Sequence, residues 1–223
     1  MILDFSWLIL SYLLGSIPFG YLIAKRRGVD VLKVGTRQIG GTNVFRNVGK
    51  WPGVLTGLLD ISKGFAAVWG AQILGLGPEV QVFGGLAAIA GHNWSCYLKF
   101  RGGRGIATFF GAAFALNPLI TLYSLIPLIV IGFFWHSTPA TLLTFLVAIS
   151  LSIVYKIDFL TLFFSLALVL ILIIRLTGKT QEIKFPSSKT QIIFNRLIFD
   201  RPPGVKPSPR PVRNLFRAGP TGK

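Results

Sequence analysis

Long apolar runs separated by short polar segments make up most of this 223-residue chain. A helix needs roughly 20 apolar residues to cross the hydrocarbon core of a bilayer, and somewhat shorter runs are tolerated. By this criterion the pattern predicts about seven membrane-spanning helices, at 5–24, 52–76, 80–90, 106–116, 118–134, 139–155 and 159–174. The predicted fold class is therefore all-α, that of a polytopic integral membrane protein.

Lysine and arginine are concentrated in three of the polar segments, which follow the first, third and seventh runs. Basic loops face the cytoplasm in membrane proteins, so the pattern predicts an outside N-terminus and a cytoplasmic C-terminal tail. Seven crossings give this parity. The first run has no basic segment before it and no small-residue cleavage site after it, so we expect a retained helix rather than a signal peptide.

The composition changes after residue 178. Residues 179–223 are rich in proline, lysine and arginine and hold too little apolar surface for a core of their own. The sequence thus predicts a transmembrane domain at 1–178 and a basic, poorly structured tail at 179–223, in solvent or along an anionic membrane surface.

The net charge limits the classes of binding partner that we expect. The chain carries 23 lysines and arginines against 7 acidic residues, a formal net charge of +16. Because these cations lie between and after apolar runs, anionic lipid headgroups and phosphorylated substrates are the expected partners, and nucleic acid is not. The single cysteine, Cys96, excludes an internal disulfide, and with only two histidines we expect neither a metal nor another cofactor. The oligomeric state is left open.

The stretch "KFRGGRGIATFF", residues 99–110, combines glycines and cations at the start of an apolar run. Its glycines are Gly102, Gly103 and Gly105, and its cations are Lys99, Arg101 and Arg104. Glycine lets the backbone approach a ligand, a helix N-terminus carries partial positive charge, and arginine suits phosphate oxygens. We interpret the stretch as a phosphate cradle; the alternative is a tight loop that follows the positive-inside pattern.

The segment "GTRQIGGTNVFRNVGKWPG" repeats this design in the first basic loop. It offers Gly35, Gly40 and Gly41, the hydroxyls of Thr36 and Thr42, the amides of Gln38 and Asn43, and Arg46. Two such loops on one side of the membrane predict one shared pocket. The alternative for Thr42 and Asn43 is that they cap the next helix.

Two charged residues lie one turn apart inside the second apolar run, Asp60 and Lys63. Charge is costly there, so we expect the two to pair, either as a support beneath the pocket or as a structural ion pair alone. His92, near the cytoplasmic end of the third run, is a candidate proton donor or acceptor, or else a hydrogen-bonded interfacial histidine.

Five segments, "SYLLGSIPFGYLIAK", "GTRQIGGTNVFRNVGK", "LLDISKG", "GHNW" and "LKFRGGRGIAT", follow one another within residues 11–108. Their order and separation resemble the bacterial acyl-phosphate:glycerol-3-phosphate acyltransferases, which are seven-helix inner-membrane enzymes. The resemblance implies transfer of an acyl group from a fatty acyl phosphate to glycerol 3-phosphate at the cytoplasmic face, giving lysophosphatidic acid for phospholipid synthesis.

The resemblance also assigns roles. Residues 102–105, with Arg104, would bind phosphate, Arg46 and Asn43 would hold glycerol 3-phosphate, and Thr36 takes the place of a functional serine. Thr36 and His92 are thus the candidate catalytic residues.

The chain departs from the family pattern at several positions. Gln38 stands where the family usually has asparagine, and Arg101 and Arg104 replace lysines. Of a third family motif with histidine and asparagine, Arg175, Leu176 and Gly178 remain after an aliphatic stretch. These losses keep two rivals open: a non-catalytic paralogue that binds phosphorylated lipid or substrate, and a small transporter.

Overall fold

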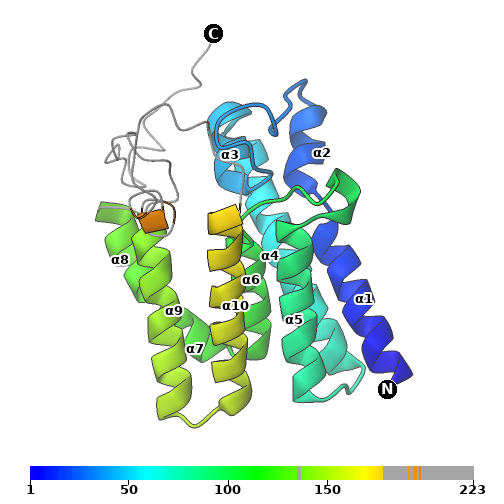
Figure 1. Cartoon of the computed structure of the whole chain (residues 1–223), viewed down its shortest axis with the longest axis vertical. Coiled ribbons are helices and arrows are strands. Elements are labelled where there is room, and N and C mark those ends of the chain that lie inside the picture. The colour runs from blue at the N-terminus through cyan, green and yellow to red at the C-terminus, as the bar shows by residue number, and fades with distance from the viewer. Residues whose placement is uncertain (135–136, 178–189, 191–192, 195, 197–223) are drawn as a thin grey trace.

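The computed structural model describes residues 1–134, 137–177, 190, 193, 194 and 196. Within 1–177, apart from 135–136, the chain forms ten α-helices and one short 3-10 helix and no strand, which confirms the all-α prediction (Figure 1). The helices are α1 (Ile2–Ser16), α2 (Phe19–Lys25), α3 (Gly41–Asn47), α4 (Lys50–Ile73), α5 (Pro78–Asn93), η1 (Cys96–Leu98), α6 (Ile106–Leu116), α7 (Pro118–Ser124), α8 (Ile126–Phe134), α9 (Ser137–Val154) and α10 (Asp158–Thr177).

Proline divides two of the predicted helices. The run 5–24 was expected to be continuous, but Ile17 adopts an extended conformation before Pro18, and α1 and α2 are separate. The run 118–134 likewise forms α7 and α8, because Pro127 has no N–H to continue the hydrogen bonding of α7. By contrast, α5 extends beyond the predicted 80–90 at both ends and so reaches sixteen residues.

Two helical stretches in the described chain are long and apolar enough to cross a membrane, namely residues 2–25 and α10. The other apolar helices are shorter. Helix α4 is continuous and about 36 Å long, but it has two charged residues in its interior. The seven crossings and their orientation therefore stay predictions. Figure 1 shows the N-terminus and the C-terminal end of α10 at opposite ends of the bundle, as an odd number of crossings requires.

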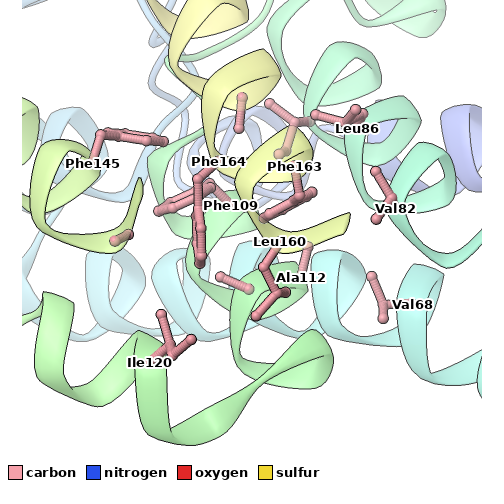
Figure 2. Close-up of a cluster of buried hydrophobic side chains, with 14 of the residues drawn as sticks. Val68, Val82, Leu86, Phe109, Ala112, Ile120, Phe145, Leu160, Phe163 and Phe164 are labelled. Atoms are coloured by element: carbon pink, nitrogen blue, oxygen red, sulfur yellow. The ribbon is translucent and has the colours of Figure 1, made fainter. Parts of the chain in front are cut away.

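Aromatic side chains fill the centre of the bundle around Phe109 of α6 (Figure 2). The Phe109 ring lies 4.2 Å from that of Phe145 in α9, and 5.8 and 5.9 Å from those of Phe163 and Phe164 in α10, measured between centroids. These rings join α6, α9 and α10, and they fix the position of α6 along the bundle.

Small residues let the helices that carry the loops approach closely. A side chain at Gly64 of α4 would overlap the carbonyl of Thr108 in α6, and one at Gly15 of α1 would overlap Ala88 of α5. Membrane helices pack through such small residues because lipid supplies no hydrophobic force between them. These contacts set the position of α6 against α4 and of α5 against α1.

Gly64→Ala is expected to destabilise the bundle by about 1–3 kcal/mol, because a methyl group there forces α4 and α6 apart. Gly57→Ala in the same helix is the matched control, since nothing lies within 4 Å of a side chain at Gly57. Thermal unfolding in detergent compares the two variants. Equal melting temperatures would contradict the close contact.

Candidate active site

The two glycine-rich loops lie at the same end of the bundle, beside the C-terminal end of α10 (Figure 1). They also touch, because Gln38 of the first loop contacts Arg104 of the second. With the Gln38 amide assigned so that its oxygen faces the guanidinium, this oxygen lies 2.9 Å from both Nε and Nη2 of the arginine. The two loops therefore meet, and the shared pocket between them stays a prediction.

Asn43 holds the first loop together. Its Oδ1 accepts hydrogen bonds from the N–H of Thr36, at 3.0 Å, and from Nδ2 of Asn47, at 2.9 Å. Its Nδ2 lies within 3.2 Å of the carbonyl oxygens of Val31, Val34 and Gln38. The side chain is buried, so these contacts give Asn43 a role in shaping the loop, and its contact with substrate stays a prediction.

The alternative interpretation, that Thr42 and Asn43 cap the next helix, is wrong. A short helix that the hydrophobic pattern does not show, α3, begins at Gly41, and its N-cap is Gly40 without a side-chain hydrogen bond. The long helix α4 starts after Gly49. Helix α3 has only seven residues and few apolar positions, which explains why periodicity missed it.

The side chains of Thr36, Thr42 and Arg46 are exposed around this loop. Gly35 supports the arrangement through its backbone, whose φ is 56° and where a side chain would collide with Asn43. The exposed hydroxyls and the guanidinium are therefore accessible to a ligand at the loop end of the bundle, while the amide beneath them is not.

The second loop folds back on the end of α5. The N–H of Gly103 donates to the carbonyl of His92 at 3.0 Å, and a side chain at Gly103 would collide with the His92 imidazole. Gly105 has a φ of 72°, and a side chain there would meet Asn93. Packing therefore requires these two glycines. It also requires Gly102, which lies against the backbone of His92 and Asn93.

The start of α6 presents donors. Within the described part of the chain, the N–H groups of Gly105, Ile106 and Ala107 have no acceptor. Consecutive unpaired N–H groups at a helix N-terminus form an anion-binding arrangement. Lys99 and Arg101 flank the loop with exposed side chains, and a left-handed backbone at Lys99 and Phe100 turns the chain there.

Arg104 connects the loops with α10. Besides its contact with Gln38, its Nη1 donates to the carbonyl of Ile174 at 2.7 Å. Arg196 donates similarly to the carbonyl of Leu176 at 2.7 Å. Cations at this helix end match the partial negative charge of its last carbonyl groups.

Beneath the loops, Asp60, Lys63 and His92 form a buried cluster. Asp60 Oδ1 lies 2.9 Å from Lys63 Nζ and 3.4 Å from His92 Nδ1, which confirms the predicted pairing of Asp60 with Lys63. Lys63 also donates to the carbonyl of Ile17, at the break between α1 and α2. The cluster thus links α1, α4 and α5 directly below Gly103, and the predicted catalytic role of His92 is not tested by these contacts.

Asp60→Asn is expected to cost about 3–5 kcal/mol of stability, because it leaves the Lys63 ammonium buried without its carboxylate. Asp60→Asn combined with Lys63→Met should recover part of this loss, since no charge then stays unpaired. Thermal unfolding in detergent or lipid nanodiscs measures both variants. A double variant less stable than Asp60→Asn would contradict this account, because the unpaired Lys63 charge would then not be the cause of the loss of stability.

Comparison with known proteins decides the family. Residues 5–184 match the family described as glycerol-3-phosphate acyltransferase. Glycerol-3-phosphate acyltransferase 4 of Dehalococcoides mccartyi (strain CBDB1) is 34% identical over 200 residues, which cover 86% of this chain and 86% of that protein. The chain belongs to the glycerol-3-phosphate acyltransferase family.

Two further members of the glycerol-3-phosphate acyltransferase family extend the comparison. Glycerol-3-phosphate acyltransferase 1 of Deinococcus radiodurans is 48% identical over 115 residues, covering 52% of this chain and 58% of the relative. The crystal structure of PlsY (YgiH), an integral membrane glycerol 3-phosphate acyltransferase in its glycerol 3-phosphate form, is 34% identical with a TM-score of 0.69. That likeness covers 80% of this chain and 94% of PlsY, so the fold is that of an integral membrane acyltransferase.

One buried residue near the two loops was not among the site candidates from the sequence. Arg175 in the last turn of α10 is 1% exposed and lies beside Ile174, whose carbonyl receives Arg104. In the sequence it stood out only as a remnant of the third family motif and as a basic residue at a membrane boundary. Gly178 and most of the predicted tail lie outside the described residues.

Proposed function

We propose that this protein transfers an acyl group from a fatty acyl phosphate to glycerol 3-phosphate and releases lysophosphatidic acid and inorganic phosphate. The juxtaposition of the two loops carries the proposal: Gln38 contacts Arg104, which directly precedes the N–H groups at the start of α6 that have no acceptor among the described residues. Family membership supports the acceptor, because PlsY is known in a glycerol 3-phosphate form and in a lysophosphatidic acid form.

The chemistry asks for anion binding and positioning. A hydroxyl oxygen of glycerol 3-phosphate attacks the carbonyl carbon of the acyl phosphate, the bond from that carbon to the phosphate oxygen breaks, and an ester forms. The hydroxyl proton leaves with the departing phosphate. Phosphate is a stable leaving group, so holding both substrates in line and stabilising negative charge supply most of the acceleration.

The loop residues take complementary parts in this proposal. Arg46, Thr42 and Asn43 form the acceptor side, with the exposed Arg46 and Thr42 facing glycerol 3-phosphate and Asn43 setting the loop. Arg104, at its contact with the first loop, binds the phosphate of glycerol 3-phosphate from the second loop. The start of α6 holds the acyl phosphate, and Lys99 and Arg101 attract both anionic substrates electrostatically.

The two catalytic candidates differ in access. Thr36 is exposed, so its hydroxyl can contact the reacting atoms. The His92 side chain is 3% exposed between Asp60 and Gly103, and we assign it to positioning the glycine loop. Asp60 and Lys63 support His92 from α4.

The membrane topology completes the proposal. Seven crossings place both loops and the basic tail on the cytoplasmic side of the cell membrane, where anionic lipid contacts the lysines and arginines. The apolar outer faces of the bundle, with Leu119, Ile129 and Val154 more than half exposed, suit contact with lipid chains.

Donor competition tests the proposed reaction. The full chain in nanodiscs is given labelled glycerol 3-phosphate with either palmitoyl phosphate or a palmitoyl thioester. We expect lysophosphatidic acid with the phosphate donor alone. Product from the thioester alone would refute the donor assignment, and binding of glycerol 3-phosphate without product from either donor would favour the non-catalytic paralogue.

A further inference from the structure

One contact at the loop end joins three segments that are distant in the sequence. The side-chain oxygen of Gln38 accepts from Nε and Nη2 of Arg104 at 2.9 Å each, while the carbonyl of Ile174 accepts from Nη1 at 2.7 Å. The first loop, the second loop and α10 therefore meet at a single guanidinium group.

We propose that Gln38 is a positioning residue that orients the Arg104 guanidinium toward substrate phosphate. This inference rests on the proposed acyl transfer. A guanidinium group is planar and rigid, with its donors in a fixed fork. Gln38, at Nε and Nη2, and the carbonyl of Ile174, at Nη1, hold the plane of this group in one orientation.

The first loop holds Gln38 firmly enough for this task. Its backbone carbonyl accepts a hydrogen bond from Asn43 Nδ2 at 2.8 Å. The next residue, Ile39, is 1% exposed and packs in a small core with Ala24, Val31 and Val44. The hydrogen bond from Asn43 and the packing of Ile39 fix the Gln38 backbone, so its amide reaches Arg104 from a defined position.

An amide suits this position better than a carboxylate. It accepts two hydrogen bonds without adding a negative charge beside the arginine, so Gln38 does not reduce the attraction of Arg104 for phosphate. Both Gln38 and Arg104 are half-buried, which limits competition from water.

The departures from the family pattern agree with this pairing. The resemblance expects a shorter asparagine and a lysine at positions 38 and 104, and this chain changes both. The two changed residues are partners in one contact.

A double-mutant cycle tests the inference. The full chain in nanodiscs, with Gln38→Leu, Arg104→Lys and the double variant, is assayed with palmitoyl phosphate while glycerol 3-phosphate is varied. We expect Gln38→Leu to raise the KM for glycerol 3-phosphate about tenfold with little change in kcat. The double variant should be no worse than Arg104→Lys, because both changes break the same contact.

Multiplying effects, or a Gln38→Leu enzyme with the wild-type KM, would overturn the inference. Gln81→Leu is the matched control, since Gln81 also makes a side-chain contact to a carbonyl, that of Leu76, at the opposite end of the bundle. If Gln38→Leu does not fold, Gln38→Ala also removes the acceptor and adds no bulk. A tenfold higher KM supports the inference, and an unchanged KM overturns it.

The same experiment separates two failures. No lysophosphatidic acid from the wild-type protein would refute the proposed reaction, and the cycle is then read from calorimetric binding of glycerol 3-phosphate. In that case, the positioning role is supported if the double variant binds no more weakly than Arg104→Lys. It is overturned if the losses of affinity of the two single variants multiply in the double variant. A wild-type enzyme that turns over, with Gln38→Leu indistinguishable from it, would overturn the positioning role alone.

Discussion

Arg104→Ala is expected to raise the KM for glycerol 3-phosphate by about 100-fold, while the protein stays folded. The substitution removes a charge-assisted contact to phosphate and also the link from the second loop to Gln38 and Ile174. Steady-state kinetics with each substrate varied in turn identifies the affected phosphate, and thermal unfolding checks the fold.

Two variants make this prediction specific. Arg27→Ala removes an exposed arginine just after α2, outside the proposed site, and should leave both KM values within about twofold of the wild type. Arg104→Lys keeps the charge but loses the fork and should fall between wild type and Arg104→Ala. Wild-type KM values in Arg104→Ala would remove Arg104 from the phosphate site.

Thr36→Ala is expected to lower kcat about 100-fold or more with little change in either KM, because a polar group at the reacting atoms acts mainly in the transition state. The loop itself should keep its shape. The bond that holds Thr36 runs from its backbone N–H to Asn43, and alanine preserves it. Rapid-quench measurement of product in one turnover reports the chemical step.

Thr36→Ser provides the matched control for the hydroxyl. It restores the residue that the family resemblance expects at this position, and activity should stay within about threefold of the wild type. A Thr36→Ala enzyme with wild-type kcat would exclude the hydroxyl from the reaction and leave charge and positioning as the sources of rate.

Several features of the site could be predicted because they depend on local spacing. Asp60 and Lys63 are one helical turn apart, so their 2.9 Å contact follows once α4 forms. The meeting of the two loops followed from charge, because both are basic and the positive-inside pattern places them on one side.

Other features depend on contacts between distant segments. The pairing of Gln38 with Arg104 requires two loops to meet in a particular register, and the carbonyl of Ile174 has no sequence signature because every residue carries one. The breaks near Pro18 and Pro127 had a local signal in proline itself, but both prolines lie inside apolar runs whose length alone predicts a single helix.

The glycines illustrate how one signal can serve two purposes. Gly103 and Gly105 were interpreted as openings for a ligand, and the structure shows that both are required for the loop to pack on His92 and Asn93. That packing leaves the first N–H groups of α6 without an acceptor in the described chain. Close packing on one side of the loop therefore accompanies available donors on the other.

The most direct test of the account is the ratio of two products formed by the purified full chain in nanodiscs. With palmitoyl phosphate and glycerol 3-phosphate supplied, we predict that lysophosphatidic acid and inorganic phosphate appear in equal amounts, and that both fall together in Arg104→Ala. Phosphate release that does not depend on glycerol 3-phosphate, or no lysophosphatidic acid at all, would contradict the acyl transfer proposed for these two loops.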